Sequence, residues 1–151
     1  MTRPRYQGVN AVDIPAWKGY RWQVRVVAGE VESIHGPVKE IAANPIYLEV
    51  AMEVESTFNL SVPGGHTALA YVFDGQGSFG GHEVSAVNLV VFGYGDEIEV
   101  RTKNTPARFM LMAGAPIGEP IVPYGPFVMN TRSEIQQALA DLRDGTFVQK
   151  E

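Results

Sequence analysis

The sequence contains no cysteine among its 151 residues. This absence excludes disulfide bonds, thiolate metal ligands and a cysteine nucleophile. It is compatible with a reducing compartment, and we expect the protein to act in the cytoplasm. Histidine is scarce as well, with three in the chain, so a metal site built on imidazole would have few candidate ligands.

The sequence also has fewer positive than negative charges, and it lacks long apolar runs. Twelve Lys and Arg stand against seventeen Asp and Glu, which gives a formal net charge of −5. Direct nucleic-acid binding usually needs a basic face, so this balance does not favour it. No apolar run approaches the roughly 20 residues that span a membrane. The first ten residues, MTRPRYQGVN, lack the apolar core of a secretion signal. We therefore expect neither a membrane nor a nucleic acid as a direct partner.

Alternation of apolar and polar residues predicts a mainly β structure. The clearest case is the segment 46–54, where every second residue is apolar over nine positions, as in a strand with one wet face. Further strands are predicted over residues 20–28, 58–62, 67–73, 87–92, 96–101 and 107–113. Asp74-Gly75-Gln76-Gly77 predicts a hairpin turn after the fourth of these strands. Seven or eight short strands with Gly-rich turns indicate an all-β antiparallel sandwich or barrel, in a single domain of residues 1–151.

The segments before and after the predicted strands both contain proline. Residues 1–17 contain two prolines and little periodicity, which indicates an extended lead-in lying on the domain. Seven of the thirteen residues from Gly114 to Pro126 are Gly or Pro, which excludes a helix or a central strand. Yet residues 114–130 also carry Ile117, Ile121 and Tyr124, which are too apolar for a free linker. We interpret this segment as an ordered strap that leads into a final helix.

A C-terminal helix is predicted over residues 131–145. Thr131 and Glu134 have the spacing of a capping box, and Gly145 is a typical C-terminal stop. An apolar stripe recurs at helical spacing and is formed by Ile135, Ala138, Leu139 and Leu142. Two interpretations stay open for this stripe: the helix covers the open end of the barrel, or it packs on a partner domain.

Several motifs resemble the C-terminal half of the pirin family, a branch of the cupin superfamily. They are PRYQ (4–7), HGPV (35–38), NPIYLEV (44–50), PGGHTALAYVFDG (63–75) and GAPIGEPIVPYGPFVMNT (114–131), in the family's order. The resemblance implies a cupin-type antiparallel jelly roll with a C-terminal helix. Family members usually carry two cupin domains, and this chain resembles the second one. In the family, the iron ligands lie in the N-terminal cupin, and some members are linked to quercetin dioxygenase activity or to transcriptional coregulation.

The resemblance also shows which metal ligands this domain lacks. The superfamily pattern is a His-x-His pair followed by a Glu and a later His, and His66 stands where the first His would be. Two residues later stands Ala68, and no Glu follows within the strand. We therefore assign no catalytic, cofactor-binding or metal-ligating residue, with His66, His82 and Glu83 as weak metal candidates that His35 could complete. Glu49, Glu53 and Glu55 form an acidic row, interpreted as an outer-face feature, with an inner carboxylate site as the alternative.

These observations leave three hypotheses about function. The first is a metal-free C-terminal cupin domain of a pirin-like protein, acting as a structural, binding or regulatory module. The second is a single-domain, quercetinase-like dioxygenase with a remodelled site at His66, His82 and Glu83. The third is a metal-free cupin that binds a small molecule in its barrel. The expected partner is an N-terminal pirin cupin half or a second copy in a homodimer. A fragment, one half of a split protein and a free-standing relative are all compatible with the sequence.

Overall fold

The computed structural model describes residues 5–148 and divides the chain into two compact units. Unit 1 extends to Pro116 and unit 2 begins at Ile117. Residues 1–4 of the expected lead-in, and residues 149–151, lie outside the described part. The organisation of 1–151 as a single domain therefore stays a prediction, and each unit is described here by itself.

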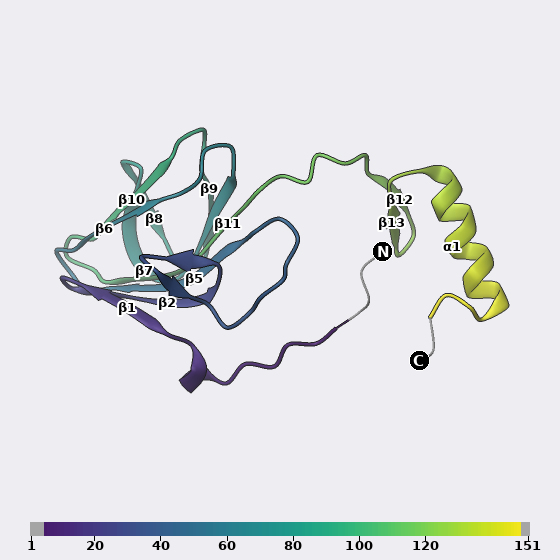
Figure 1. The fold of residues 1–151 in the computed structure, drawn as a ribbon. Helices are drawn as coiled ribbons and strands as arrows, with labels where there is room; N and C mark the ends of the chain where they lie inside the picture. Colours follow the sequence, from purple (N-terminus) through teal and green to yellow (C-terminus); the bar gives the residue numbers. More distant parts are fainter. Residues whose placement is uncertain (1–4, 149–151) are drawn as a thin grey trace. The chain divides into compact units, whose positions relative to one another are not determined.

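Unit 1 is built on a nine-stranded sheet that curls on itself (Figure 1). The pairing order is β1-β2-β5-β11-β7-β10-β6, with β8 and β9 also paired to β7, and every strand pair in this sheet is antiparallel. The strands are β1 (Ala16–Gly19), β2 (Trp22–Ala28), β5 (Ile46–Met52), β6 (Thr57–Ser61), β7 (Thr67–Phe79), β8 (His82–Ser85), β9 (Asn88–Val91), β10 (Glu97–Arg101) and β11 (Ala107–Gly114). The antiparallel β fold expected from the sequence is confirmed.

The predicted hairpin at Asp74-Gly75-Gln76-Gly77 is wrong, because β7 runs through these residues without a break. Gly75 has a φ of 75°, and the pairing between β7 and β11 shifts register between Arg108 and Phe109, which marks a β-bulge. A Cβ at Gly75 would lie 1.8 Å from the carbonyl oxygen of Pro106. Glycine is therefore required here for a bend within a long strand rather than for a chain reversal. The reversal comes at Gly80-Gly81, where Phe79 pairs with His82.

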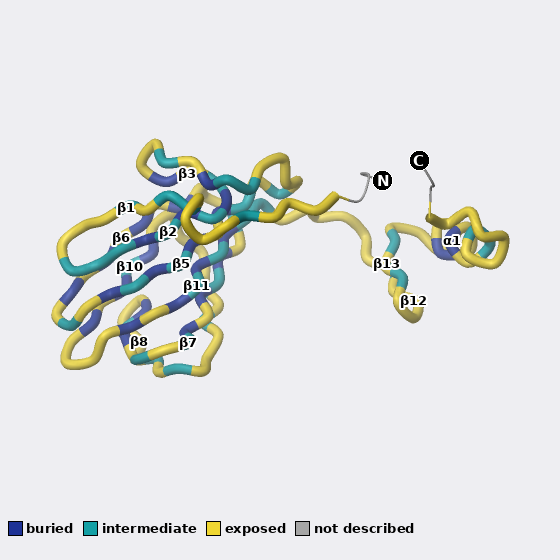
Figure 2. The backbone as a smooth tube through the Cα atoms, turned by 90° about the horizontal axis from the view of Figure 1, so that it is seen from below, coloured by how far each residue is buried: buried dark blue, intermediate teal, exposed yellow. Residues whose placement is uncertain are grey.

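The interior of unit 1 is aliphatic with a line of aromatic rings. Buried residues alternate with exposed ones along the strands, so one side of each strand faces the core (Figure 2). The burial pattern of β5 confirms the alternation predicted for residues 46–52. Edge-to-face contacts join Trp17 to Trp22, Trp22 to Phe58, and Phe58 to Phe109, with ring centroids 4.5, 5.4 and 6.4 Å apart. The two Trp side chains therefore extend the core toward β1.

The N-terminal segment contains short elements that periodicity does not reveal. A 3-10 turn, η1 (Ala11–Asp13), precedes β1, so the last two residues of the expected lead-in belong to a strand. Gln7 exchanges hydrogen bonds with the backbone of Lys39, at 3.0 and 3.1 Å. A separate two-stranded sheet is formed by β3 (Glu30–Val31) and β4 (Ile34–His35). These strands have four residues or fewer, too short for an alternation pattern to emerge.

Unit 2 consists of a hairpin and a helix. The expected strap contains β12 (Val122–Tyr124) and β13 (Phe127–Met129), which pair antiparallel around Gly125-Pro126. The positive φ of Gly125, 53°, suits the first central position of a two-residue hairpin loop. Pro123 has no backbone N–H to donate. It is tolerated because each strand of an isolated pair has one edge that makes no ladder hydrogen bonds and needs no donor. Phe147 packs edge-to-face on Phe127, with ring centroids 5.4 Å apart.

The helix α1 (Arg132–Asp144) begins and ends where the sequence predicts. Thr131 Oγ1 accepts from the Glu134 backbone N–H at 3.2 Å, and Glu134 Oε2 accepts from the Thr131 backbone N–H at 2.8 Å. This reciprocal pair confirms the capping box. Gly145 ends the helix in the left-handed conformation, with φ 72°. Ile135 and Ala138 are buried, while Leu139 and Leu142 of the same stripe are exposed. Among the described residues, no helix has the length and apolar character of a membrane span.

Candidate functional site

His66 lies in the turn between β6 and β7. Its backbone N–H donates to the Pro63 carbonyl at 3.1 Å, and its Nδ1 is buried without a hydrogen-bond partner among the described residues. Two residues on, where a second His would complete the superfamily pair, Ala68 is buried in β7, followed by Ala70 and Val72 on the same face. The inward positions of β7 therefore present aliphatic carbon, which cannot ligate a metal.

His82 and Glu83 lie together at the start of β8, on an exposed part of the sheet. The Glu83 carboxylate accepts from Gln76 Nε2 at 3.3 Å and lies 3.6 Å from Lys103 Nζ. These contacts engage the carboxylate with donors on neighbouring segments. His82 and Glu83 lie together because they are adjacent in the sequence, as expected. Both line a cleft on this side of the sheet.

The structure does not assemble the remodelled metal site considered from the sequence. His66 is not among the residues that line the cleft beside His82. His35 lies on β4, with its Nδ1 3.6 Å from Glu30 Oε2 on β3. In the described part of the chain, no three His, Asp or Glu side chains are grouped so that they could hold a metal ion. The side chains of the described residues therefore do not fit the iron that the resemblance implies for the other half of such proteins.

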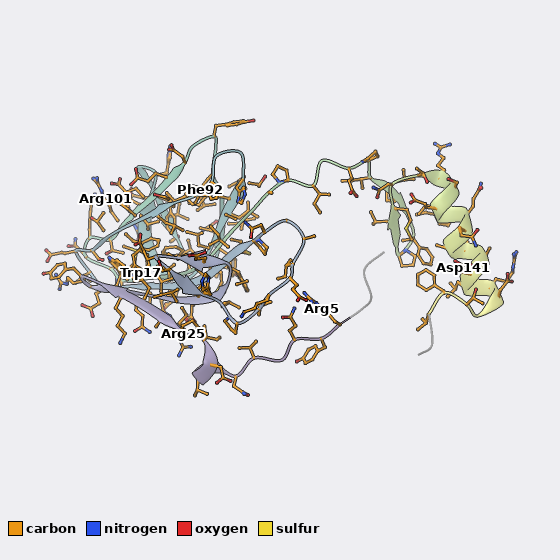
Figure 3. The ribbon with its side chains drawn as sticks, in the orientation of Figure 1. Arg5, Trp17, Arg25, Phe92, Arg101 and Asp141 are labelled. Carbon is orange, nitrogen blue, oxygen red and sulfur yellow. The ribbon has the colours of Figure 1, made fainter. Side chains whose placement is uncertain are left out.

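The cleft beside β8 and β9 has a volume of about 630 Å³. Its lining combines apolar residues, among them Phe79, Val84, Val90 and Phe92, with polar ones, among them His82, Glu83 and Asn88. Figure 3 labels Phe92, which follows β9 and is half-buried against the core. Asn88 Nδ2 donates to the Ser85 carbonyl at 3.0 Å, which ties β9 to the end of β8. The volume of this cleft lies within the range of small-molecule sites, although such sites are usually more apolar.

The acidic row lies on the outer side of the sheet, as expected. Glu49 Oε1 accepts from Arg108 Nη2 at 2.6 Å, and Glu49 Oε2 lies 3.8 Å from Arg25 Nη1. Arg25 points away from the curled sheet (Figure 3). Glu53 and Glu55 both lie within 3.6 Å of the guanidinium of Arg21. These carboxylates form surface ion pairs, so the alternative of an inner carboxylate site is wrong.

Sequence reasoning missed the cleft because it assigned the chain reversal to Asp74-Gly75. The signal that could have located it is Gly80-Gly81, since two adjacent glycines with positive φ, 55° and 89°, suit a tight hairpin. That hairpin aligns β8 with the second half of β7, while β9 pairs with its first half. The bulge at Gly75 separates the two halves, and the cleft forms beside them.

The curled antiparallel sheet of unit 1, with its aliphatic and aromatic core, places this domain among the antiparallel β-barrels and sandwiches, the class to which cupins belong. The family model of the pirin C-terminal cupin domain matches residues 47–148. The chain therefore belongs to the pirin family, as its C-terminal cupin domain.

Individual relatives agree with this assignment. Pirin-1 of Arabidopsis thaliana is 38% identical, with 95% of this chain and 52% of Pirin-1 covered. Human pirin is 31% identical, with 95% of this chain and 51% of pirin covered. The crystal structure of quercetin 2,3-dioxygenase from Acinetobacter baumannii superimposes with a TM-score of 0.82 at 29% identity, covering 95% of this chain and 50% of that one. The chain thus spans about half the length of these relatives.

Proposed function

We propose that this chain is a metal-free cupin domain that acts as a structural and binding module for the N-terminal cupin half of a pirin-like protein, rather than as a catalyst on its own. The observation that carries the proposal is the inner face of β7, where Ala68, Ala70 and Val72 occupy the inward positions. Iron chemistry at this place would need imidazole or carboxylate ligands pointing inward. The quercetin dioxygenase activity named for the A. baumannii protein is therefore not proposed for this domain alone.

The size of the relatives supports the second part of the proposal. Each is about twice as long as this chain, and the matched family model describes a C-terminal domain. A second half of similar size thus precedes the matched part in those proteins. A metal-free domain joined to such a half contributes by packing on it, and this role needs surface complementarity rather than reactive groups.

The test is the metal content of the untagged chain, measured by elemental mass spectrometry after mild purification and again after loading with Fe²⁺. The proposal predicts no stoichiometric metal in either sample. The matched variants are His66→Ala and His82→Ala, which remove the two imidazoles considered as ligands. Stoichiometric iron, copper, nickel or zinc that is lost in either variant would overturn the metal-free role and favour the single-domain dioxygenase.

A second candidate function is small-molecule binding in the cleft beside β8 and β9, favoured by its volume of about 630 Å³ and its mixed lining. A ligand present at 100 times its Kd stabilises the folded protein by about 2.7 kcal/mol. Screening apolar and aromatic compounds by thermal denaturation would detect such a ligand. The variant Val84→Trp, which fills the cleft, should abolish the shift. A ligand whose effect survives this substitution binds elsewhere and removes the cleft as its site.

A further inference from the structure

The strand β9 lies at a free edge of the main sheet. In the described part of the chain, it pairs with β7 on one side and with no strand on the other. Phe92 donates its backbone N–H to the Ala68 carbonyl at 3.1 Å, and the register continues through β9 without a shift. Backbone groups alternate in direction along an antiparallel strand. Val90 therefore bonds to β7, and the N–H and C=O groups of Leu89 and Val91 point away from it.

This edge of β9 lacks the features that usually protect an exposed strand. Charged side chains, proline and bulges normally keep such an edge from pairing with another strand. The sequence of β9 is Asn88-Leu89-Val90-Val91, without a charge, a proline or a bulge. The strand β8 differs, because Glu83 places a carboxylate on it. Of the two strands beside the cleft, β9 is therefore the one suited to accept a further strand.

The cleft lies along the same edge. Val84, Val90 and Phe92 line it and pack, half-buried, against the core. A strand added to β9 would lie about 4.8 Å beyond it. Side chains alternate between the two sides of a strand, so every second side chain of the added strand would point to the side of Val90. The cleft, with a volume of about 630 Å³, is on that side and can receive them.

The charge around the cleft favours an apolar or basic occupant. Glu83 is its one acidic lining residue, and no Lys or Arg of the described residues lines it. Lys103 Nζ lies 3.6 Å from the Glu83 carboxylate, but its side chain is 79% exposed. An ion pair this exposed is weak, so a second cation can approach Glu83. The net charge of the chain, −5, acts in the same direction.

We propose that the free edge of β9 and the adjoining cleft bind an extended peptide segment, which adds to the sheet as a further strand. The peptide backbone exchanges hydrogen bonds with Leu89 and Val91, and its alternate apolar side chains enter the cleft. A Lys or Arg of the peptide is attracted by Glu83. In this mode of recognition, main-chain hydrogen bonds provide affinity and side-chain pockets provide specificity. The inference rests on the binding role proposed for the cleft and deepens it by naming the class of ligand.

The test is amide hydrogen exchange of this chain, followed by NMR without and with a probe peptide. The probe is acetylated and amidated, alternates Val with Thr around a central Phe, and has a Lys at each end. In the chain alone, the amides of Leu89 and Val91 should exchange much faster than that of Val90, which bonds to β7. With the peptide at about ten times its Kd, exchange of Leu89 and Val91 should slow roughly tenfold, because only the free form exchanges.

A matched pair of proline variants tests the edge itself. Val91→Pro removes an outward N–H without removing a bond to β7, so it should keep the Tm and abolish peptide binding. Asn59→Pro is the control on the edge strand β6. Val62 donates to the Asp96 carbonyl at 2.8 Å, and by alternation the N–H of Asn59 points away from β10. Asn59→Pro should keep both the Tm and peptide binding.

Two N-methylated forms of the probe test the hydrogen bonds without altering the protein. One carries methyl groups on the backbone nitrogens of Thr and the other on those of Val and Phe, so each form blocks one edge of the extended peptide. One form should lose at least about tenfold in affinity, and the other should bind as the parent does. Replacing the Lys ends by Glu should weaken binding, and Glu83→Gln should reduce that difference.

Three results would contradict the proposal. The first is unchanged exchange of Leu89 and Val91 with the probe and with versions that carry Leu or Trp in place of Phe. The second is equal affinity of the two methylated forms. The third is slow exchange of both amides in the chain alone that strengthens with protein concentration, since a second copy would then occupy the edge. The small-molecule role of the cleft can survive each failure. A compound whose thermal shift is lost in Val84→Trp supports that role even when no peptide binds.

Discussion

Small residues on β7 determine what the interior of unit 1 can hold. Ala68 and Ala70 place methyl groups on the inner face, where imidazole or carboxylate side chains would be needed for a metal. Leu111 of the adjacent strand pairs with Ala70 and is fully buried. The interior is thus packed as a core, and the surface of the domain is where binding is expected.

Gly75 is the residue of β7 whose replacement should be most damaging. Its positive φ strains any L side chain, and a Cβ would lie 1.8 Å from the Pro106 carbonyl oxygen. We expect Gly75→Ala to lower the free energy of unfolding by about 2 kcal/mol or more, measured by urea denaturation. The matched control is Gly64→Ala, because a Cβ there meets no atom within 4 Å. Equal stability of the two variants would contradict the assignment of a tight bulge.

The start of α1 should respond to pH through its capping box. Hydrogen bonds from the Thr131 side chain and the Thr131 backbone hold the pKa of Glu134 below its usual range. A lowered pKa in the folded state means that the ionised carboxylate stabilises the helix. This contribution is complete above the unfolded-state pKa and is lost as pH falls through the lowered folded-state pKa.

We therefore expect amide exchange in α1, corrected for the intrinsic pH dependence of exchange, to accelerate in acid. Glu134→Gln should remove that acid response, since the amide does not titrate. Thr131→Ala should cost about 1 kcal/mol of helix stability at neutral pH, because it removes the N-cap acceptor. An acid response that persists in Glu134→Gln would place the responsible group elsewhere.

Elements with strong local signals were predictable from the sequence, and those set by long-range pairing were not. The strand around Leu48 and the helix that follows Thr131 each carry a complete local pattern, and both form as expected. Asp74-Gly75 carries a hairpin signal, but positive φ serves a bulge equally well, and only the pairing with β11 distinguishes the two. The apolar residues on the outer side of the sheet could not be grouped from the sequence for the same reason. Alternation places Tyr47 and Met110 opposite the core, and strand pairing then joins them to Leu89 and Tyr71.

The candidate site shows the same limit. The absence of a ligand pattern after His66 was visible in the sequence because it depends on the spacing of neighbouring residues. The cleft was not, since it arises between β8 and β9, and their placement depends on the bend of β7 at Gly75. The presence or absence of a short ligand pattern can thus be judged from the sequence. A surface formed by several strands can be located only when the register of those strands is known.

The two units differ in how much apolar surface they bury. The curled sheet of unit 1 encloses a continuous aliphatic and aromatic core. Unit 2 is shorter than the ~40 residues below which a domain usually needs further stabilisation. It buries Ile135 and Ala138 on its helix, while Val128, Leu139 and Leu142 stay exposed. A two-stranded hairpin alone is marginally stable in water. Unit 2 therefore has both a need for external packing and apolar side chains that could provide it.

We expect amide hydrogen exchange of this chain to reveal that difference. Amides of β5, β7 and β11 should be strongly protected, because they belong to the centre of the sheet, and amides of α1 and β13 should exchange faster by orders of magnitude. In a chimera in which the N-terminal half of Arabidopsis Pirin-1 precedes this chain, protection of α1 should rise if that half contacts the exposed stripe of Leu139 and Leu142. Leu142→Gln should prevent the rise, and Gln136→Ala, at an exposed polar position of the same helix, should not.

Slow exchange of α1 in the chain alone, equal to that of β11, would mean that unit 2 is stable by itself. The exposed stripe of α1 would then have no need of a partner.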